Sequence, residues 1–440
     1  MSTSFSTDTR RVAVVGAGMA AARFAQQLLA RTAPGAVEVT LYGAEPDAPY
    51  NRTLLADVLT GRHDPDGIGL PLAEGATVRT GTRVTAVAPA TRSLTLADGT
   101  TGHYDTLVLA TGAAPVLPPL RGLRDGGSGD GDGLLGRDGP FDGHGLDGDE
   151  PASDDGLLGG VHVLRTLADC RALAAAARRS AHAVVLGGGV LGVSAARALA
   201  ALGTATTIVH RAARVMERHL DDRSAHLLHG QLTALGITTH LAAHPVALHG
   251  AGHVHAVELA DGTKLETDLV LLACGTRPRT ALARAAGLRV RHGVVVDDRL
   301  AASAPGVHAI GDCAEHRGVV HGLTGPAWDQ ADALAAHLAG ADPGARRTGT
   351  RPLTRLSAGP LQITAFGDMA AEHAPGHDVL RYSDTSRGTS ATLVLRGDRL
   401  VAGVLLGDLT ATGDIALAWH RDEPLPADPS YLLIPEGARA

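Results

Sequence analysis

Short apolar runs alternate with amphipathic segments along the first three quarters of the chain, an order typical of parallel sheets covered by helices. Apolar strands are predicted at residues 11–15 and 183–186, and each leads through a glycine-rich turn into an apolar helix. These helices are predicted to reach about Ala30 and Leu202, and the next strands follow at 37–42 and 204–209. The same unit therefore occurs twice, which predicts an α/β fold with two doubly wound domains.

Each unit continues with hairpins and further strands. The later strands of the two units are predicted at residues 82–87, 93–96, 107–110, 269–273, 293–297 and 307–309. Asp98-Gly99 and Asp261-Gly262 are typical hairpin turns. A helix is predicted to begin at Thr324, with Pro326 in its first turn. From about Arg346 alternating strands at 362–366, 392–395 and 400–406 predict a third, β-rich domain.

These elements divide the chain into five predicted segments. The first α/β domain is expected in two parts, 1–121 and 281–344; the second spans 160–280, the β-rich domain spans 345–440, and an insertion spans 122–159. The insertion holds ten acidic residues and two arginines and therefore contributes −8, so that the rest of the chain is near +1 against a formal net charge of −7. A segment this rich in Gly and Asp buries too little apolar surface to order, so a disordered, solvated insertion is predicted.

Composition excludes several other classes. The most apolar window, 183–196, is free of charge for about 14 residues, fewer than the roughly 18 that a membrane span needs. The polar start of the chain predicts no secretory signal. Cys170, Cys274 and Cys313 lie far apart and form no local pair, which fits a reducing, cytoplasmic setting. No metal is expected, because no acid or cysteine completes a site around the histidine pairs His240/His244 and His253/His255.

The two glycine-rich turns carry the clearest candidate chemistry. They read Gly16-Ala17-Gly18-Met19-Ala20-Ala21 and Gly187-Gly188-Gly189-Val190-Leu191-Gly192. In this pattern the first glycine makes the turn, the second lets the backbone approach a pyrophosphate, and the third small residue lets the helix pack on its strand. The helix N-terminus then offers unpaired N–H groups to a diphosphate. The two turns predict two dinucleotide sites, and Glu45, just beyond the second strand, is placed to accept both hydroxyls of an adenosine ribose.

Further motifs follow in a recognisable order. They are Ala110-Thr111-Gly112-Ala113-Ala114-Pro115, Cys274-Gly275-Thr276-Arg277-Pro278 and Ile310-Gly311-Asp312-Cys313-Ala314. With the two loops, they resemble the FAD-dependent pyridine nucleotide oxidoreductases, a family with two doubly wound domains and a C-terminal α+β interface domain. Residues 49–59, 321–326 and 381–408 look most like one branch, the flavoprotein module of assimilatory nitrite reductase large subunits and nitrate reductase electron-transfer subunits.

The resemblance implies an FAD site on the first loop. Arg52 would lie against the pyrophosphate or the flavin, Asp312 would accept a hydrogen bond from the ribitol chain, and the helix from Thr324 would direct its positive end at the flavin. Trp328 is either a cofactor contact or a structural tryptophan. The residues expected to contact FAD are Gly16, Gly18, Met19, Ala20, Ala21, Glu45, Arg52, Val84, Ala110, Thr111, Gly112, Gly311, Asp312 and Thr324.

The second loop would bind NADH or NADPH and present the hydride to flavin N5. The residues expected there are Gly187, Gly189, Val190, Leu191, Gly192, His210, Arg211 and Gly275. Where an NAD site would end its second strand in an acid, this chain has Val209-His210-Arg211, with Arg214 nearby. Because His and Arg attract a 2′-phosphate, NADPH is expected to be favoured over NADH.

One departure from the family concerns the flavin edge. Many relatives have a lysine and a glutamate that form an ion pair there, whereas this chain has Asp57 and Ser194 at the aligned positions. Losing both members avoids an unpaired buried charge. Hydride transfer depends more on alignment than on acid–base help, so catalysis is still expected.

The resemblance implies an FAD-dependent NAD(P)H oxidoreductase that passes electrons to a separate redox protein, such as a nitrate or nitrite reductase, a ferredoxin or a rubredoxin. Three alternatives stay open: a ferredoxin or rubredoxin reductase, an NAD(P)H oxidase, and a flavin-bound redox sensor or assembly factor with little turnover. Neither a nucleic acid nor a membrane is an expected partner, and a homodimer is the oligomer that relatives suggest.

Overall fold

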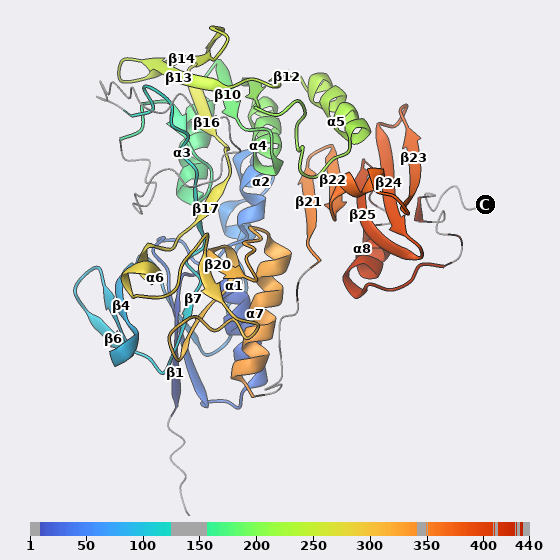
Figure 1. The fold of residues 1–440 in the computed structure, drawn as a ribbon. Coiled ribbons are helices and arrows are strands. Elements are labelled where there is room, and N and C mark those ends of the chain that lie inside the picture. The colour runs from blue at the N-terminus through green and yellow to red at the C-terminus, as the bar shows by residue number, and fades with distance from the viewer. Residues whose placement is uncertain are drawn as a thin grey trace, which may run out of the picture.

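The computed structural model describes residues 9–124, 156–340, 349, 351–407, 409, 412–426, 428 and 432–433. Figure 1 shows two α/β bodies stacked one above the other and a smaller β-rich body beside them. The predicted fold class, two Rossmann-like domains followed by a C-terminal α+β domain, is confirmed.

The first domain is built on a parallel five-stranded sheet in the order β19-β7-β1-β2-β3. Its strands are β1 (Arg10–Val15), β2 (Val37–Tyr42), β3 (Ala76–Arg79), β7 (Thr106–Leu109) and β19 (Val307–Ala309). The last four residues of β1 and all of β7 are buried, because helices and a second layer cover both faces of the sheet there. Since β19 comes from residues beyond the second domain, the first domain is assembled from two parts of the chain, as Figure 1 shows by colour.

Helices α1 (Met19–Arg31) and α7 (Thr324–Leu338) lie side by side against this sheet. Arg23 of α1 and Asp332 of α7 join them through two hydrogen bonds of 2.7 and 2.9 Å. The remaining elements of this domain are α2 (Leu55–Leu59), α6 (Ala281–Ala285), β4 (Val84–Ala88), β5 (Ser93–Leu96), β6 (Thr101–His103), β18 (Val294–Val296) and β20 (Ala314–His316). Gly99, with φ +85°, makes the turn between β5 and β6 that its sequence predicts.

The second domain repeats this plan with a parallel sheet in the order β12-β11-β10-β16-β9. Its elements are β9 (Val161–His162), α3 (Leu167–Ala177), β10 (His182–Leu186), α4 (Val190–Ala201), β11 (Ala205–Val209), α5 (Asp222–Ala234), β12 (Ile237–His240), β13 (Pro245–Gly250), β14 (Val254–Leu259), β15 (Lys264–Glu266) and β16 (Leu269–Leu272). Strands β13, β14 and β15 form a separate antiparallel sheet. The predicted internal repeat is therefore present in the structure.

Two short strands cross between the α/β domains. The strand β8 (Ala113–Pro115) pairs antiparallel with β17 (Thr276–Pro278), and each directly follows a buried strand of its own domain. This pairing joins the motif that contains Thr111 to the motif that contains Gly275. The sequence indicates that the two motifs are repeats, but not that they contact each other.

The third domain is an antiparallel sheet in the order β21-β22-β25-β24-β23, with α8 (Thr412–Arg421) on one side. The strands are β21 (Leu353–Ala358), β22 (Leu361–Phe366), β23 (Asp378–Asp384), β24 (Thr389–Arg396) and β25 (Arg399–Leu406). The inner strands β24 and β25 are buried, and Trp419 of α8 packs on Phe366 with ring centroids 5.0 Å apart.

Most of the expected 122–159 insertion, residues 125–155, lies outside the described residues. Both of its ends are described, and they pack against the second domain. Leu123 and Leu158 are buried, and the Leu158 N–H donates to the Leu123 carbonyl at 3.0 Å. Residues 122–124 and 156–159 therefore belong to the packed second domain, which composition alone does not indicate.

Within the described residues, none of the helices combines the length and the apolar character needed to span a bilayer.

Candidate functional site

The first glycine-rich loop runs from β1 into α1, as predicted. Gly16 has φ +114°, and a Cβ added there would lie 2.1 Å from the Ala110 carbonyl oxygen, so no larger residue fits. Its N–H donates to the Tyr42 carbonyl at 2.9 Å. The loop is thus fixed at the carboxyl ends of β1, β2 and β7, and Ala21 is fully buried where α1 crosses the sheet.

The second loop has the same geometry. Gly187 has φ +118°, and its added Cβ would lie 2.2 Å from the Ala273 carbonyl oxygen. A Cβ on Gly192 would lie 1.9 Å from the Gly187 carbonyl oxygen, which is the close strand–helix packing that the third glycine was predicted to allow. Val190 and Leu191 begin α4, and Leu191 is 36% exposed.

The crossing strands bring further predicted residues to the same region. The Thr111 hydroxyl donates to the Arg279 carbonyl at 2.8 Å, and the Arg279 N–H donates to the Gly112 carbonyl at 2.9 Å. On the other side, the Val116 N–H donates to the Gly275 carbonyl at 2.9 Å. These bonds fix the two strand-end motifs to each other.

Glu45, Tyr50 and Arg52 form a polar cluster beside the first loop. The Tyr50 hydroxyl donates to Glu45 Oε2 at 2.6 Å and accepts from the Leu167 N–H at 3.1 Å. Arg52 Nη2 donates to Glu45 Oε1, and the guanidinium lies 5.0 Å from the Tyr50 ring centroid. Burial of the ring raises the pKa of Tyr50, so the hydroxyl stays protonated.

Two further arginines join this cluster, and the sequence interpretation missed both. Arg165 Nη2 lies 2.6 Å from Asp312 Oδ2, and Arg52 Nη1 donates to the Arg165 carbonyl at 2.6 Å. Burial lowers the pKa of Arg279, and the nearby Arg52 and Arg165 lower it further. A signal for Arg165 exists in the sequence, since it directly precedes a capping box formed by Thr166 at the start of α3.

The remaining expected FAD contacts lie around α7 and β4. Gly311 has φ +75°, its N–H donates to Gln330 Oε1 of α7 at 2.6 Å, and its added Cβ would lie 3.1 Å from Ala20 Cβ. Thr324 begins α7, and Trp328 in the next turn is 39% exposed. Val84 begins β4 and is partly buried. Gly311 and Ala20 are therefore in contact, and Val84 lies in the small antiparallel sheet.

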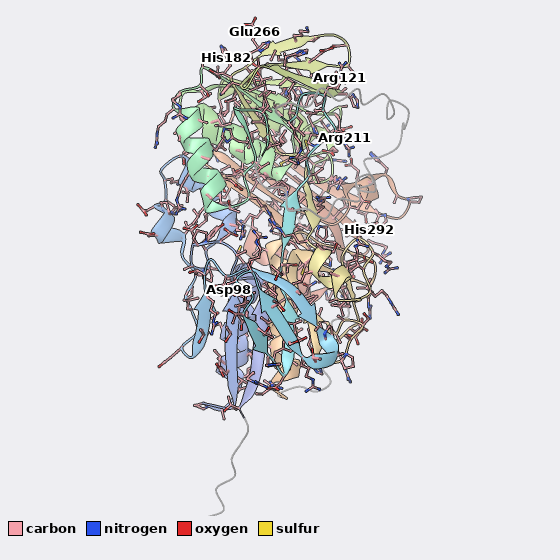
Figure 2. All side chains as sticks on the ribbon, turned by 90° about the vertical axis from the view of Figure 1, so that its left-hand side faces the viewer. Asp98, Arg121, His182, Arg211, Glu266 and His292 are labelled. Atoms are coloured by element: carbon pink, nitrogen blue, oxygen red, sulfur yellow. The ribbon has the colours of Figure 1, made fainter. Side chains whose placement is uncertain are left out.

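The structure changes the interpretation of the second site at His210. Both ring nitrogens contact protein groups: Nδ1 accepts from the Gly188 N–H at 3.1 Å, and Nε2 lies 2.9 Å from Glu217 Oε2. The ring is buried, so it does not present a free nitrogen to a 2′-phosphate. Arg214 pairs with Asp222. Figure 2 shows Arg211 nearer to the first domain than His182 and Glu266, which lie toward the outer end of the second domain.

Asp57 and Ser194, aligned with the family's flavin-edge pair, have different environments. Asp57 of α2 is 7% exposed, and its Oδ1 lies 3.2 Å from Arg197 Nη2 of α4, while Arg62 Nη1 is 3.9 Å away. Ser194, one turn before Arg197, is partly buried. Asp57 of α2 and Arg197 of α4 therefore form a buried ion pair.

All three cysteines are described, and none of them forms a disulfide. Cys170 is buried, which raises the pKa of its thiol to about 11. In the described part of the chain, no group of three or more His, Cys, Asp or Glu side chains is arranged to bind a metal.

The residues present fit the two expected dinucleotides. A Cβ added to Gly18 would have Arg52 Nε, 4.0 Å away, as its nearest neighbour, and one added to Gly189 would meet no described atom within 4 Å. The second glycine of each loop therefore has open space beside it, where a pyrophosphate can approach the backbone. Around the first loop, three guanidinium groups face two carboxylates, an excess of positive charge that suits a diphosphate.

The fold therefore consists of two dinucleotide-binding domains joined by crossing strands. The family model of the pyridine nucleotide-disulphide oxidoreductases matches residues 10–331, and the chain belongs to this family. It is accordingly an FAD-dependent NAD(P)H oxidoreductase, as its sequence motifs predict.

Similar proteins support the same branch that the sequence indicates. The chain is 31% identical over 410 residues to an NAD(P)H nitrite reductase of Bacillus subtilis (strain 168), which covers 91% of this chain and 46% of that protein. It is 30% identical over 404 residues to the assimilatory nitrate reductase electron transfer subunit of the same organism, covering 91% and 48%. The chain thus spans about half the length of these curated relatives.

A solved structure shares the fold along almost the whole chain. A ferredoxin reductase from Rhodopseudomonas palustris matches with a TM-score of 0.79 at 24% identity, covering 98% of this chain and all of that one.

Proposed function

We propose that this chain takes a hydride from NAD(P)H through FAD and passes the electrons to a separate redox protein of nitrite or nitrate assimilation. The observation that carries the proposal is the similarity, along nine-tenths of the chain, to a nitrite reductase and to a nitrate reductase electron transfer subunit. Bound FAD would accept the two electrons of the hydride and release them to the partner.

In this proposal the chain's own residues bind and align the two nucleotides. Gly16 and Gly187 shape the two loops, and the N-termini of α1 and α4 direct their N–H groups at the diphosphates. Arg52 and Arg165 neutralise the diphosphate beside the first loop, while Glu45 and Asp312 orient both guanidinium groups. The pairing of β8 with β17 keeps the two domains in register, which is the alignment that hydride transfer needs.

The cysteines support an acceptor other than a disulfide of this chain. Cys170 and Cys313 are buried, Cys274 is exposed, and all three are free thiols. Electrons therefore have no described disulfide to reach, and three free thiols suit the reducing cytoplasm that we propose as the location.

Anaerobic rapid mixing of the flavin-loaded protein with NADH or NADPH tests the first half of the proposal. We expect the visible flavin absorbance to bleach within about a second, in the usual range of enzyme turnover. Oxidised nitrite reductase, nitrate reductase, ferredoxin or rubredoxin is then added, and the return of the flavin absorbance is followed. Rapid return with a nitrite or nitrate reductase supports the proposal.

A variant of the second loop gives the matched control. Gly189→Ala adds a methyl group where the structure has room, so folding and flavin content should be retained. Its methyl group faces the pyrophosphate, so bleaching by NAD(P)H should slow at least tenfold while bleaching by dithionite is unchanged. Fast reoxidation by ferredoxin alone would favour a ferredoxin reductase, and a slow, stable nucleotide complex without turnover would favour a sensor; either outcome contradicts the proposed function.

A further inference from the structure

The two nucleotide-binding domains differ at the residue that follows the second strand. In the first domain Gly43 follows β2, and a Cβ added to it would lie 2.8 Å from the Cβ of Ala17 in the loop. In the second domain the corresponding loop residue is Gly188, and its added Cβ would lie 2.9 Å from Cγ of His210, the residue after β11. The space between the loop and the residue after the second strand is thus filled by the Ala17 methyl group in the first domain and by the His210 imidazole in the second.

The imidazole of His210 connects the loop to Glu217. Because Nδ1 accepts the Gly188 N–H at 3.1 Å, the neutral ring carries its proton on Nε2, which donates to Glu217 Oε2 at 2.9 Å. The Met216 N–H also donates to the Gly188 carbonyl at 2.8 Å. The segment from His210 to Glu217 is thus fixed to the glycine turn, and the Glu217 carboxylate lies one imidazole ring away from it.

The carboxylate of Glu217 is charged and reachable from solvent. The hydrogen bond from His210 lowers the pKa of Glu217, and its side chain is 29% exposed. Arg218 is the nearby cation that also favours the ionised form, and His219 next to it is partly buried. Arg214, which the sequence suggests as a phosphate contact, is already paired with Asp222. A fixed anion therefore lies one imidazole ring away from the second glycine-rich loop.

We propose that Glu217, positioned by His210, accepts hydrogen bonds from the adenosine ribose of the pyridine nucleotide and makes NADH the preferred donor over NADPH. This inference rests on the proposed function and concerns only which nucleotide the second loop selects. A carboxylate at this place binds the two free ribose hydroxyls and repels a 2′-phosphate, so its charge acts on the two nucleotides in opposite directions.

Titration calorimetry of the flavin-loaded protein with NAD⁺ and with NADP⁺ tests the inference by binding alone. Glu217→Gln keeps an acceptor for His210 and removes only the charge. We expect NAD⁺ affinity to fall about tenfold, because a hydrogen bond to a charged group is lost. NADP⁺ affinity should rise, and the ratio of kcat/KM for NADH and NADPH should move in the same direction. Glu217→Asp keeps the charge and should retain the preference for NADH.

The hairpin β13–β14 offers a matched control, because His249 Nε2 and Glu258 Oε2 form a similar pair at 2.6 Å. Glu258→Gln removes the same charge and should leave both affinities unchanged. Equal losses for NAD⁺ and NADP⁺ in Glu217→Gln would show that Glu217 only supports the loop, and would overturn the inference while the proposed function stands. Failure of the parent protein to bind either nucleotide would instead overturn both.

Discussion

Two glycines, Gly16 and Gly187, have nearly the same backbone geometry although they lie in different domains. Their φ angles are +114° and +118°, and their added Cβ atoms would lie 2.1 and 2.2 Å from the carbonyl oxygen of the residue that follows the neighbouring strand. A side chain at either place meets both a strained backbone conformation and a backbone clash. The requirement for glycine is thus structural at the first position of each loop and separate from ligand binding.

This difference predicts opposite outcomes for Gly16→Ala and Gly18→Ala. Gly16→Ala forces the loop away from the Ala110 carbonyl, so we expect a lower thermal midpoint and little bound flavin. Gly18 has no positive φ and no described atom closer than 4.0 Å to its added Cβ, so Gly18→Ala should fold with a midpoint near that of the parent apoprotein. It should nevertheless bind FAD at least tenfold more weakly, as measured by flavin titration. Equal loss of stability in both variants would contradict this assignment.

The sequence predicts these glycines well because their chemistry is local. The turn, its spacing and the following helix all lie within a few residues. His210 shows the limit of such prediction. Its position beside Arg211 indicates a phosphate contact, yet its role depends on where the ring points and on Glu217, seven residues later. Arg165 was missed for a similar reason, since its partner Asp312 is distant in sequence.

At the scale of elements, helix α5 joins the second domain to the third. Its N-cap Asp221 is 4% exposed; Oδ1 accepts from the Ser224 N–H at 2.7 Å, and Oδ2 accepts from the Thr392 hydroxyl of β24 at 2.7 Å. Further along α5, Gln231 Nε2 donates to the Gly388 carbonyl at 2.8 Å. The helix therefore packs on the third domain partly through polar contacts.

Thr392→Val tests this contact with little change in side-chain volume. Removing the hydroxyl leaves a buried carboxylate oxygen of Asp221 without that donor, which should destabilise the protein by about 1–3 kcal/mol. Thr364 in the same sheet is the control, because it is fully buried and its hydroxyl has no hydrogen-bond partner among the described residues. Thr364→Val should leave the chemical unfolding midpoint unchanged or raise it. A neutral Thr392→Val would show that the bond to Asp221 contributes little to docking.

The elements that the sequence predicted are those with a strong local pattern, and the missed ones depend on contacts with other parts of the fold. The parallel strands β1, β2 and β10 were predicted within a residue, because β1 and β10 contain apolar runs and β2 alternates apolar and polar residues. Helix α5 was not predicted, because the partner that accepts its polar face lies in another domain. Strand β23 was also missed, since it lies at the edge of its sheet and none of its residues is buried.

At the scale of the whole molecule, one hydrophobic core runs through parts of all three domains. It includes Leu55 of α2, Val193 of α4 and Leu361 of β22. The ion pair of Asp57 and Arg197 lies at this junction. An added Cβ at Gly359, in the turn between β21 and β22, would lie 3.4 Å from the Arg197 guanidinium, so the third domain covers the pair. The sequence places Asp57 at the family's flavin-edge position but does not indicate Arg197 as its partner.

Arg197→Met should therefore affect the molecule as a whole. It leaves Asp57 buried with only the exposed Arg62, 3.9 Å away, and breaking a buried pair on one side typically costs about 3–5 kcal/mol. Unfolding is readily followed in separate domains, because Trp328 belongs to α7 and Trp419 to α8. We expect both signals to shift to lower denaturant concentration, and the double variant Asp57→Leu with Arg197→Met to recover most of the loss, since no buried charge remains.

The half-exposed pair of Arg23 and Asp332 provides the comparison within one domain. Exposed ion pairs contribute about 0–1 kcal/mol, so Arg23→Met should shift the Trp328 signal slightly and leave the Trp419 signal in place. If Arg197→Met were as mild, or if the double variant were no more stable than the single one, the buried pair would not couple the three domains. Their association would then depend on the shared apolar core alone, and the charge at position 57 would have to be explained by the flavin-edge position that the family resemblance implies.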